Sequence, residues 1–406
     1  MKAYRVYLTL NLVTSVAFWL AFAVNSIYYV TVARLDPLQL VLVGTTLEAA
    51  VFLFEIPTGV VADVYSRRLS IIIGIFMIGA GFLLEGSLPV FGAILLSQVL
   101  WGIGYTFTSG ATQAWITDEV GGEEAAAPIF LRGAQFDQLG SLAGILLSTI
   151  LAAVTRINLP ILACGAIFIG LGFFLILVMP ETGFHPTPRS ERTTWNSMLH
   201  VMRSGLGTVR HHPTLSSILV AGFFFGLYSE GLDRLWTAHL LQRFTFPLFP
   251  TVVWIGGIEL VSLLLAMLAT ELVKRKLNLK RWRSLVGTLL ALSTIIFICL
   301  LGFSQAWSLA LAIGFYWVLT ALRHVISPLY TTTVNQGLSS EVRATVISVS
   351  SQVDAIGQIG GGPLVGLIAR QASIPVGLLG SALLLTPALG ILGRIFNKRV
   401  ETIEAD

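Results

Sequence analysis

The sequence predicts an all-α membrane protein with twelve transmembrane helices, arranged as two pseudo-symmetric six-helix bundles. Three observations lead to this fold class. Of the 406 residues, 55% are hydrophobic and only 11% are charged, whereas soluble domains carry about 25% charged residues. The apolar residues form runs of about 20, the length that an α-helix needs to cross the hydrocarbon core of a bilayer. A polar stretch in the middle of the chain divides these runs into two equal sets.

Twelve apolar runs, each bounded by charged or turn-forming residues, give the expected spans. The polar stretch between the sixth and seventh runs, residues 181–213, contains prolines, histidines and several arginines, and we interpret it as a cytoplasmic linker. We therefore expect an N-terminal six-helix bundle over residues 1–180 and a C-terminal six-helix bundle over residues 214–406. The spans are residues 6–30, 38–58, 70–86, 90–115, 129–154, 159–180, 214–236, 250–272, 285–303, 306–330, 344–369 and 374–394.

The first span resembles a signal peptide in two respects but is expected to be retained. Lys2 and Arg5 precede it, and Ala21-Phe-Ala23 imitates a cleavage site. The apolar run continues to about residue 33, which is longer than the apolar region of a typical signal peptide. A first transmembrane helix accounts for this length.

The distribution of Lys and Arg predicts that both termini lie in the cytoplasm. In that orientation 19 of the 25 basic residues fall in inner segments and 5 in outer segments, while Arg323 lies within a span. Cytoplasmic loops of membrane proteins show such an excess of basic residues. We therefore expect a multi-pass protein of the cell (inner or plasma) membrane. Its net charge of +4 follows from topology, so no nucleic-acid partner is expected.

An internal repeat indicates that the two halves are related. Residues 134–144, AQFDQLGSLAG, align without gaps on residues 351–361, SQVDAIGQIGG, at an offset of 217 residues. The alignment superimposes Asp137 on Asp354 and maps the fifth span onto the eleventh. Parallel repeats of this kind are known from transporter folds.

A charged break, Gly59-Val-Val-Ala-Asp63-Val-Tyr-Ser-Arg67-Arg68, separates the second span from the third. Gly59 permits a close backbone approach or an abrupt turn. Asp63, Arg67 and Arg68 require a water-facing connection, because an unpaired charge is costly in lipid. The pattern and its position resemble the loop 2–3 signature G-x-x-x-D-x-x-G-R-K/R of the major facilitator superfamily (MFS).

Val64 and Ser66 depart from that signature, which usually has a basic residue and a glycine at these places. The alternative interpretation is an ordinary loop whose basic residues face the cytoplasm. The resemblance implies a twelve-span secondary transporter, in which two six-helix bundles give alternating access to a site near the middle of the membrane.

The resemblance also implies a gating cluster on the cytoplasmic side. Arg67 or Arg68 is expected to pair with Asp118 at the end of the fourth span, and Asp63 is expected to face the start of span 344–369. A carboxylate at a helix N-terminus is favoured by the helix dipole. Such a cluster would lock the halves together in the outward-open state. Alternatively, these charges serve only to keep the loop soluble.

Glu48 and Glu259 are expected near the middle of the second and eighth spans, at an offset of 211 residues. A charged carboxylate at that depth costs roughly 3 kcal/mol on insertion scales, so burial favours the protonated form. Either residue is a candidate for proton coupling or for binding a cationic substrate. The alternative is a protonated glutamate that bonds to a neighbouring helix.

Asp137 shares a helix face with Gly140 and Gly144, at spacings of three and seven residues. Small residues in membrane helices mark close helix packing. Asp137 and its repeat partner Asp354 are therefore expected to point into the bundle. A structural latch between helices and a role in transport are both compatible with this position.

Arg323 is expected deep within the tenth span and needs a counter-charge. Glu259 or Asp354 could supply it, or Arg323 could hold an anionic group of a substrate through paired hydrogen bonds. The neighbouring His324 could carry protons, although a packed histidine with satisfied hydrogen bonds is the better expectation.

Trp19, Trp101 and Trp317 fall within the first, fourth and tenth spans. In the family that the sequence resembles, these helices help to line the central cavity, so aromatic walls for an apolar or cationic substrate are implied. Packing in the core or against lipid is the more common role of tryptophan.

The leading functional hypothesis is proton-coupled efflux of amphipathic or drug-like compounds by a monomeric transporter, with protons and a small molecule as its partners. Uptake of a small organic anion is the alternative, and a non-transporting sensor on the same fold is a remote one. No phosphate-binding loop or metal-binding helix motif is found, so neither an enzyme nor a cofactor or metal is expected.

Two family signatures are incomplete and weaken the case for drug–proton antiport. Gln98 occupies the place of an arginine that the family associates with proton coupling in the fourth span. The antiporter pattern of the fifth span also lacks its proline, since Gly140-Ser-Leu-Ala-Gly144 continues into Ile145.

Overall fold

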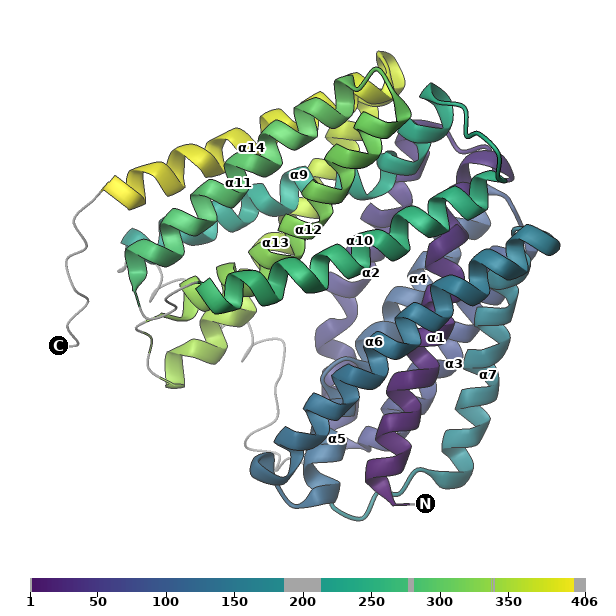
Figure 1. Cartoon of the computed structure of the whole chain (residues 1–406). Coiled ribbons are helices and arrows are strands. Elements are labelled where there is room, and N and C mark those ends of the chain that lie inside the picture. The colour runs from purple at the N-terminus through teal and green to yellow at the C-terminus, as the bar shows by residue number, and fades with distance from the viewer. Residues whose placement is uncertain (1, 186–212, 277–280, 337, 339, 398–406) are drawn as a thin grey trace. The chain divides into compact units, whose positions relative to one another are not determined.

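The computed structural model describes residues 2–185, 213–276, 281–336, 338 and 340–397, and these residues are almost entirely helical (Figure 1). The described part of the chain contains no β-strand. A helix satisfies its own backbone hydrogen bonds, which is what a segment in hydrocarbon requires. The expected all-α fold is confirmed.

Seven described helices lie before residue 186 and six after residue 212. The first set is α1 (Ala3–Thr31), α2 (Pro37–Val64), α3 (Arg67–Ser87), α4 (Phe91–Thr108), α5 (Ala111–Val120), α6 (Glu123–Val154) and α7 (Leu159–Val178). The second set is α9 (Pro213–Arg243), α10 (Thr251–Lys276), α11 (Trp282–Gln305), α12 (Leu309–Asn335), α13 (Ser340–Gln371) and α14 (Ile374–Asn397). Most of the expected linker 181–213 lies outside the described residues.

Each of the twelve expected spans coincides with a helix, or with the consecutive pair α4 and α5. Among the described residues, 11 segments are long and apolar enough to cross a membrane. Helix α13 is not among them, because Gln352, Asp354, Gln358 and several glycines lower its hydropathy. It nevertheless occupies the place of the eleventh span and is 32 residues long.

The fourth span differs from the expected single helix, since it breaks after Thr108 and resumes at Ala111. The break falls at Gly110, whose φ of +69° is a conformation that side chains with a Cβ rarely adopt. The second piece, α5, ends at Gly121, with a φ of +89°. Two glycines therefore delimit a separate helix that carries Asp118.

The described helices fall into two compact units. Unit 1 contains α1, α2 from Thr46 onward, α3 to α7 and the start of α10 as far as Glu259. Unit 2 contains residues Asp36–Thr45, α9, α10 from Leu260 onward and α11 to α14. The residues of α2 up to Thr45 therefore belong to unit 2, and the residues of α10 up to Glu259 belong to unit 1.

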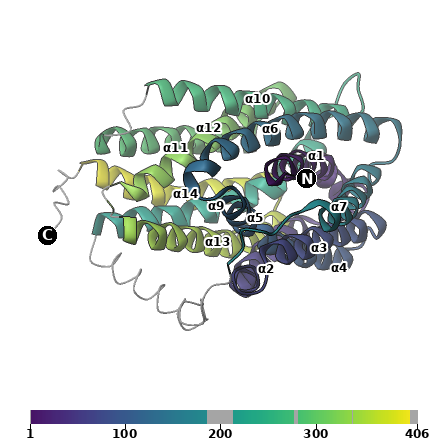
Figure 2. The same ribbon diagram turned by 90° about the horizontal axis from the view of Figure 1, so that it is seen from below.

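The same helix pairings occur in both units. In unit 1, α1 packs against α6 and α7, and α3 packs against α4 and α7 (Figures 1 and 2). In unit 2, α9 packs against α13 and α14, and α11 packs against α12 and α14. The sequence repeat that relates α6 to α13 therefore extends to the packing of their neighbours, which supports two halves of common origin.

Glycines at repeated positions create the closest pairings. A Cβ at Gly144 in α6 would lie 2.8 Å from the carbonyl oxygen of Val16 in α1. A Cβ at the equivalent Gly361 in α13 would lie 2.0 Å from the carbonyl oxygen of Leu227 in α9. The expectation that small residues mark close helix packing is confirmed at both positions.

Substitution of Gly361 by Ala should destabilise unit 2, because the added methyl group meets backbone rather than a movable side chain. Overpacking of this kind costs about 1–3 kcal/mol. The matched control is Gly360→Ala in the same turn, where a Cβ meets nothing within 4 Å. Thermal unfolding of the detergent-solubilised variants, followed by tryptophan fluorescence, should show a lower Tm for Gly361→Ala alone. Equal losses in both variants would contradict the packing argument.

Candidate functional site

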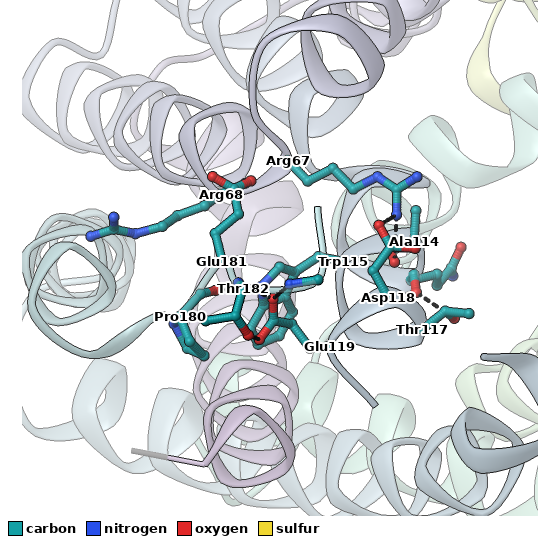
Figure 3. A network of polar contacts seen from close by, with 12 residues as sticks. Arg67, Arg68, Ala114, Trp115, Thr117, Asp118, Glu119, Pro180, Glu181 and Thr182 are labelled. Carbon is teal, nitrogen blue, oxygen red and sulfur yellow. Dashed lines mark hydrogen bonds and ion pairs between the residues drawn. The ribbon is translucent and has the colours of Figure 1, made fainter. Parts of the chain in front are cut away.

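The ion pair expected between the second loop and the end of the fourth span is present. Nη1 of Arg67, the first residue of α3, donates to the carboxylate of Asp118 in α5 and to the carbonyl oxygen of Ala114, 2.7 Å away (Figure 3). The side chains of Arg67 and Asp118 are 18% and 28% exposed, so the pair is partly shielded from water. Hydrogen bonds between two charged groups are among the stronger ones in proteins.

The adjacent arginine does not join that pair. Nη2 of Arg68 donates to the carbonyl oxygen of Ile176 in α7, at 2.6 Å, and its backbone N–H donates to Glu181 at 2.8 Å. The other carboxylate oxygen of Glu181 accepts from the hydroxyl of Ser66 at 2.7 Å. Ser66 also caps α3, since its Oγ accepts from the N–H of Leu69. The serine that departs from the family signature therefore has a structural role.

A second carboxylate completes the contacts around the end of α5 (Figure 3). Glu119 accepts from the hydroxyl of Thr182 at 2.9 Å and from the N–H of Gly183 at 2.7 Å. The indole of Trp115 donates to the carbonyl oxygen of Pro180 at 2.7 Å. These contacts join the start of α3, helix α5 and the residues that follow α7. The contacts of Glu181 were not expected, although an acidic residue directly after a transmembrane span can indicate a polar contact at the end of that helix.

The remaining members of the loop motif behave differently from the expectation. Helix α2 continues to Val64, so only Tyr65 and Ser66 separate it from α3. Gly59 therefore lies inside a helix, where a Cβ would meet nothing within 4 Å, and the expected turn or close approach at this residue is wrong. Asp63 is exposed, and its contact with the start of α13 stays a prediction.

Arg323 pairs with an aspartate that the sequence analysis did not consider. Its guanidinium in α12 donates through both terminal nitrogens to the carboxylate of Asp233 in α9, and the Nη2–Oδ2 distance is 2.7 Å. The guanidinium also lies 5.8 Å from the ring centroid of Tyr228, within reach of a cation–π contact. Asp233 therefore supplies a counter-charge for Arg323, Asp354 lies within its electrostatic range, and a contact with Glu259 stays a prediction.

The reason for this difference is the length of α9, which ends at Arg243 rather than near residue 236. Asp233 and Arg234, expected close to the outer end of the span, lie well inside the helix. One turn before Arg234, the buried Glu230 accepts from its Nε at 2.8 Å, and the side chain of Glu230 is only 3% exposed. Two ion pairs thus involve adjacent turns of α9.

The other polar candidates lie at the positions along their helices that the expected spans gave them. Glu48 and Glu259 are half-buried and lie next to the points where α2 and α10 pass from one unit to the other. Asp354 is half-buried and accepts from the amide of Gln358 at 2.8 Å. The ring of His324 contacts the carbonyl oxygen of Thr320, one turn earlier in α12, at 2.9 Å, but the residue is exposed rather than packed as expected. The roles of the carboxylates in transport stay predictions.

Asp137 is exposed as a residue, and its backbone carbonyl oxygen accepts from the hydroxyl of Ser15 in α1 at 2.7 Å. Its carboxylate lies within electrostatic range of Tyr7 in α1. Gly140 and Gly144 are buried against α1. The expectation that Asp137 points into the bundle stays a prediction.

Trp19 and Trp101 are packed among other aromatic rings in unit 1. Trp101 lies 5.4 Å from the centroid of Phe22 and 5.5 Å from that of Phe82, and Trp19 lies 6.2 Å from that of Phe22. Such ring pairs contribute packing energy of their own. Trp317 in α12 is half-buried. Packing explains Trp19 and Trp101, and a role as cavity walls stays a prediction for all three.

Unit 1 also contains a pocket of about 230 Å³ beside the break between α4 and α5. Its lining combines aromatic and aliphatic side chains with hydroxyl and amide groups, and none of the described residues that line it is charged. The lining includes Asn11, Thr14, Phe18, Tyr105 and Phe168. Apolar walls with a few polar groups are typical of small-molecule sites.

A comparison with protein-family models identifies the chain through its residues 7–362, which match the model described as Major Facilitator Superfamily. The protein belongs to this superfamily. The resemblance seen in the second loop is thereby confirmed over most of the chain, and with it the MFS fold. The protein is an integral multi-pass membrane transporter.

Relatives and solved structures agree with this assignment. The chain is 22% identical over 356 residues to an uncharacterized MFS-type transporter, YxaM, of Bacillus subtilis (strain 168), covering 86% of this chain and 84% of that protein. The nucleoside transporter NupG matches with a TM-score of 0.80 at 13% identity, covering 98% of this chain and all of that one. A bacterial homologue of the human lysosomal transporter Spinster, in an inward-facing and occupied conformation, matches with a TM-score of 0.74 at 15% identity, covering 97% and 96%.

A double-mutant cycle should show that Arg67 and Asp118 interact. Arg67→Gln and Asp118→Asn should each lower the unfolding free energy by about 1–3 kcal/mol, because each leaves a partly buried partner unmatched. The double variant should lose less unfolding free energy than the two single variants together, and the difference, the coupling energy, should be about 1 kcal/mol. Denaturant unfolding in detergent measures these free energies. Arg68→Gln combined with Asp118→Asn is the control, and its effects should add.

Proposed function

We propose that this transporter is a proton-coupled exporter of amphipathic small molecules, which works by alternating access as a monomer. We place it in the cell membrane with both termini in the cytoplasm, as the distribution of basic residues favours. The observation that carries the proposal is the ion pair between Asp233 and Arg323 in unit 2.

An ion pair inside a membrane helix bundle responds strongly to a single proton. While Asp233 is ionised, it compensates the charge of Arg323. A proton on Asp233 leaves the guanidinium without that compensation, at a cost that is reduced because Asp233 is 45% exposed. Protonation therefore favours an arrangement in which Arg323 reaches water or another acceptor. This is the differential stability of two states that coupling requires.

The exposure of the two partners suits this role. The side chain of Asp233 is 45% exposed and that of Arg323 is 22% exposed, and the proposal requires that the exposed part of Asp233 faces water. Tyr228 lies against the guanidinium, and Asp354 on α13 is close enough to Arg323 to interact electrostatically. We assign Asp354 as a second carboxylate on the proton path, with Glu48 and Glu259 as further candidates.

The pocket in unit 1 supports an amphipathic substrate. Its walls combine Phe18 and Phe168 with the polar groups of Asn11 and Thr14, and none of the lining side chains is charged. A solute with a large charge would lose its hydration there without gaining a counter-ion. A molecule with apolar rings and a few hydrogen-bonding groups fits this lining better.

Transport of an organic anion is the second candidate, and the geometry of Arg323 favours it. The guanidinium already holds the Asp233 carboxylate through two bonds, which is the geometry by which it would hold the carboxylate of a substrate. A substrate carboxylate would displace Asp233, and a proton on Asp233 would assist that exchange. The direction of proton flux relative to substrate separates the two candidates.

The test measures proton movement in proteoliposomes that carry a gradient of each substrate candidate, over a panel of lipophilic cations and organic anions. We expect wild-type protein to move protons against a lipophilic substrate. Asp233→Asn should lower substrate-driven proton flux at least tenfold, because the titrating carboxyl group is gone. Glu271→Gln, which alters an exposed glutamate near the end of α10 that pairs with Arg275 in the same helix, is the matched control and should retain the flux.

A second variant separates coupling from folding. Asp233→Asn with Arg323→Gln removes both charges, so it should unfold at a Tm closer to wild type than Asp233→Asn alone. Substrate movement without proton flux in this double variant supports coupling at the pair. Undiminished proton flux in it would contradict the assignment, and loss confined to Glu48→Gln or Glu259→Gln would move the coupling site to α2 or α10.

A further inference from the structure

Glu85, near the end of α3, is the most enclosed carboxylate among the described residues, at 1% exposed. Its Oε1 lies 2.8 Å from the hydroxyl of Tyr29 in α1. Its Oε2 lies 3.0 Å from the hydroxyl of Ser97 and 3.0 Å from the amide nitrogen of Gln98, both in α4. The hydroxyl of Tyr28 holds the backbone carbonyl of Glu85 at 2.6 Å. The carboxyl group is therefore fixed in place from two neighbouring helices.

The hydroxyl of Ser97 is in contact with two acceptors. Its Oγ lies 2.7 Å from the carbonyl oxygen of Ile94, one turn earlier in α4, and 3.0 Å from Oε2 of Glu85. A serine hydroxyl has one hydrogen and two lone pairs. The shorter contact is the familiar bond from serine to a carbonyl in the preceding turn. With that hydrogen directed to Ile94, a hydrogen on Glu85 would satisfy the contact between Ser97 and Glu85.

We propose that Glu85 is a proton-binding site of unit 1, which carries its proton on Oε2 in this conformation and donates it to Ser97. Binding is the simple addition of one proton to the carboxylate. On release, the hydrogen of Ser97 turns from Ile94 to Glu85. This site goes beyond the proposed coupling at Asp233, because it lies in the other unit and involves different helices.

The surroundings of Glu85 accommodate both protonation states. In the neutral state, Oε2 donates to Ser97 and Oε1 accepts from Tyr29. In the ionised state, the hydroxyls of Tyr29 and Ser97 and the amide of Gln98 can all donate to the carboxylate. The carboxyl group has hydrogen-bond partners in both states. A buried carboxyl group without such partners would lower the stability of the fold. The site can therefore exchange its proton.

Three titratable groups near Glu85, those of Tyr28, Tyr29 and Cys164, are weak acids. Tyr28 and Tyr29 approach from α1, and the buried thiol of Cys164 in α7 lies within its electrostatic range. The side chains from α4 are neutral. At the start of α7, the amide of Asn158 holds the carbonyl oxygen of Gly86 at 3.0 Å. These neutral groups favour the uncharged carboxylic acid over the carboxylate.

Infrared spectroscopy of the full-length protein in lipid vesicles tests the proposal, because a carboxylic acid has a C=O stretching band that a carboxylate lacks. At neutral pH, the difference spectrum between wild type and Glu85→Gln should show the loss of an acid band. Glu124→Gln, at an exposed position in the first turn of α6, is the matched control and should show the loss of carboxylate bands. The Glu85 band should decrease reversibly as the pH is raised.

Ser97→Ala provides a second measurement, which also covers failure of Glu85→Gln to fold. It removes the acceptor of the proposed bond, so the acid band should remain and shift to higher frequency. Loss of carboxylate bands in Glu85→Gln, or no shift in Ser97→Ala, would overturn the proposal. An acid band that persists at every pH at which the protein stays folded would also overturn it, since such a proton does not exchange. None of these readouts depends on transport, so they stand apart from the test of Asp233.

Discussion

A charge placed among membrane helices needs a partner, and this requirement shapes the polar interior of the protein. Arg323 meets Asp233 and Arg234 meets Glu230, so that two basic groups of unit 2 are each matched by a carboxylate from α9. In unit 1, Glu85 is surrounded by hydroxyl and amide groups. Each solution lowers the cost of a polar group in an apolar region. The proposed proton-binding roles of Asp233 and Glu85 rest on these arrangements.

Close packing of repeated glycines holds the helices that carry these groups. Gly144 sets α6 against α1, and Gly361 sets α13 against α9. The resulting pairings are the same in both units. The polar groups are not repeated with them: the ion pairs of α9 have no counterpart at the equivalent positions of α1, which reads Phe18-Trp-Leu-Ala-Phe22 in its middle. A shared framework therefore carries different chemistry in its two halves.

The network around α3, α5 and α7 suits a conformational element rather than a binding site. One ion pair and several bonds to backbone atoms join the ends of three helices. The separate helix α5, delimited by Gly110 and Gly121, carries Asp118, and its part in gating stays a prediction.

Hydropathy and basic-residue patterns, which follow from the physics of the bilayer, determined the number and order of the spans and the family resemblance. The spacing of Asp137, Gly140 and Gly144 likewise predicted close helix packing, because helix periodicity relates sequence to one face, and the structure shows that the partner is α1. The partner of Arg323 could not be predicted from the sequence, because Asp233 is 90 residues away along the chain and the length of α9 had to be known first. The enclosure of Glu85 depends in the same way on side chains from α1 and α4. The sequence predicts which residues share a helix face, because helix periodicity is local. Contacts between helices that are distant in the sequence depend on how the helices pack.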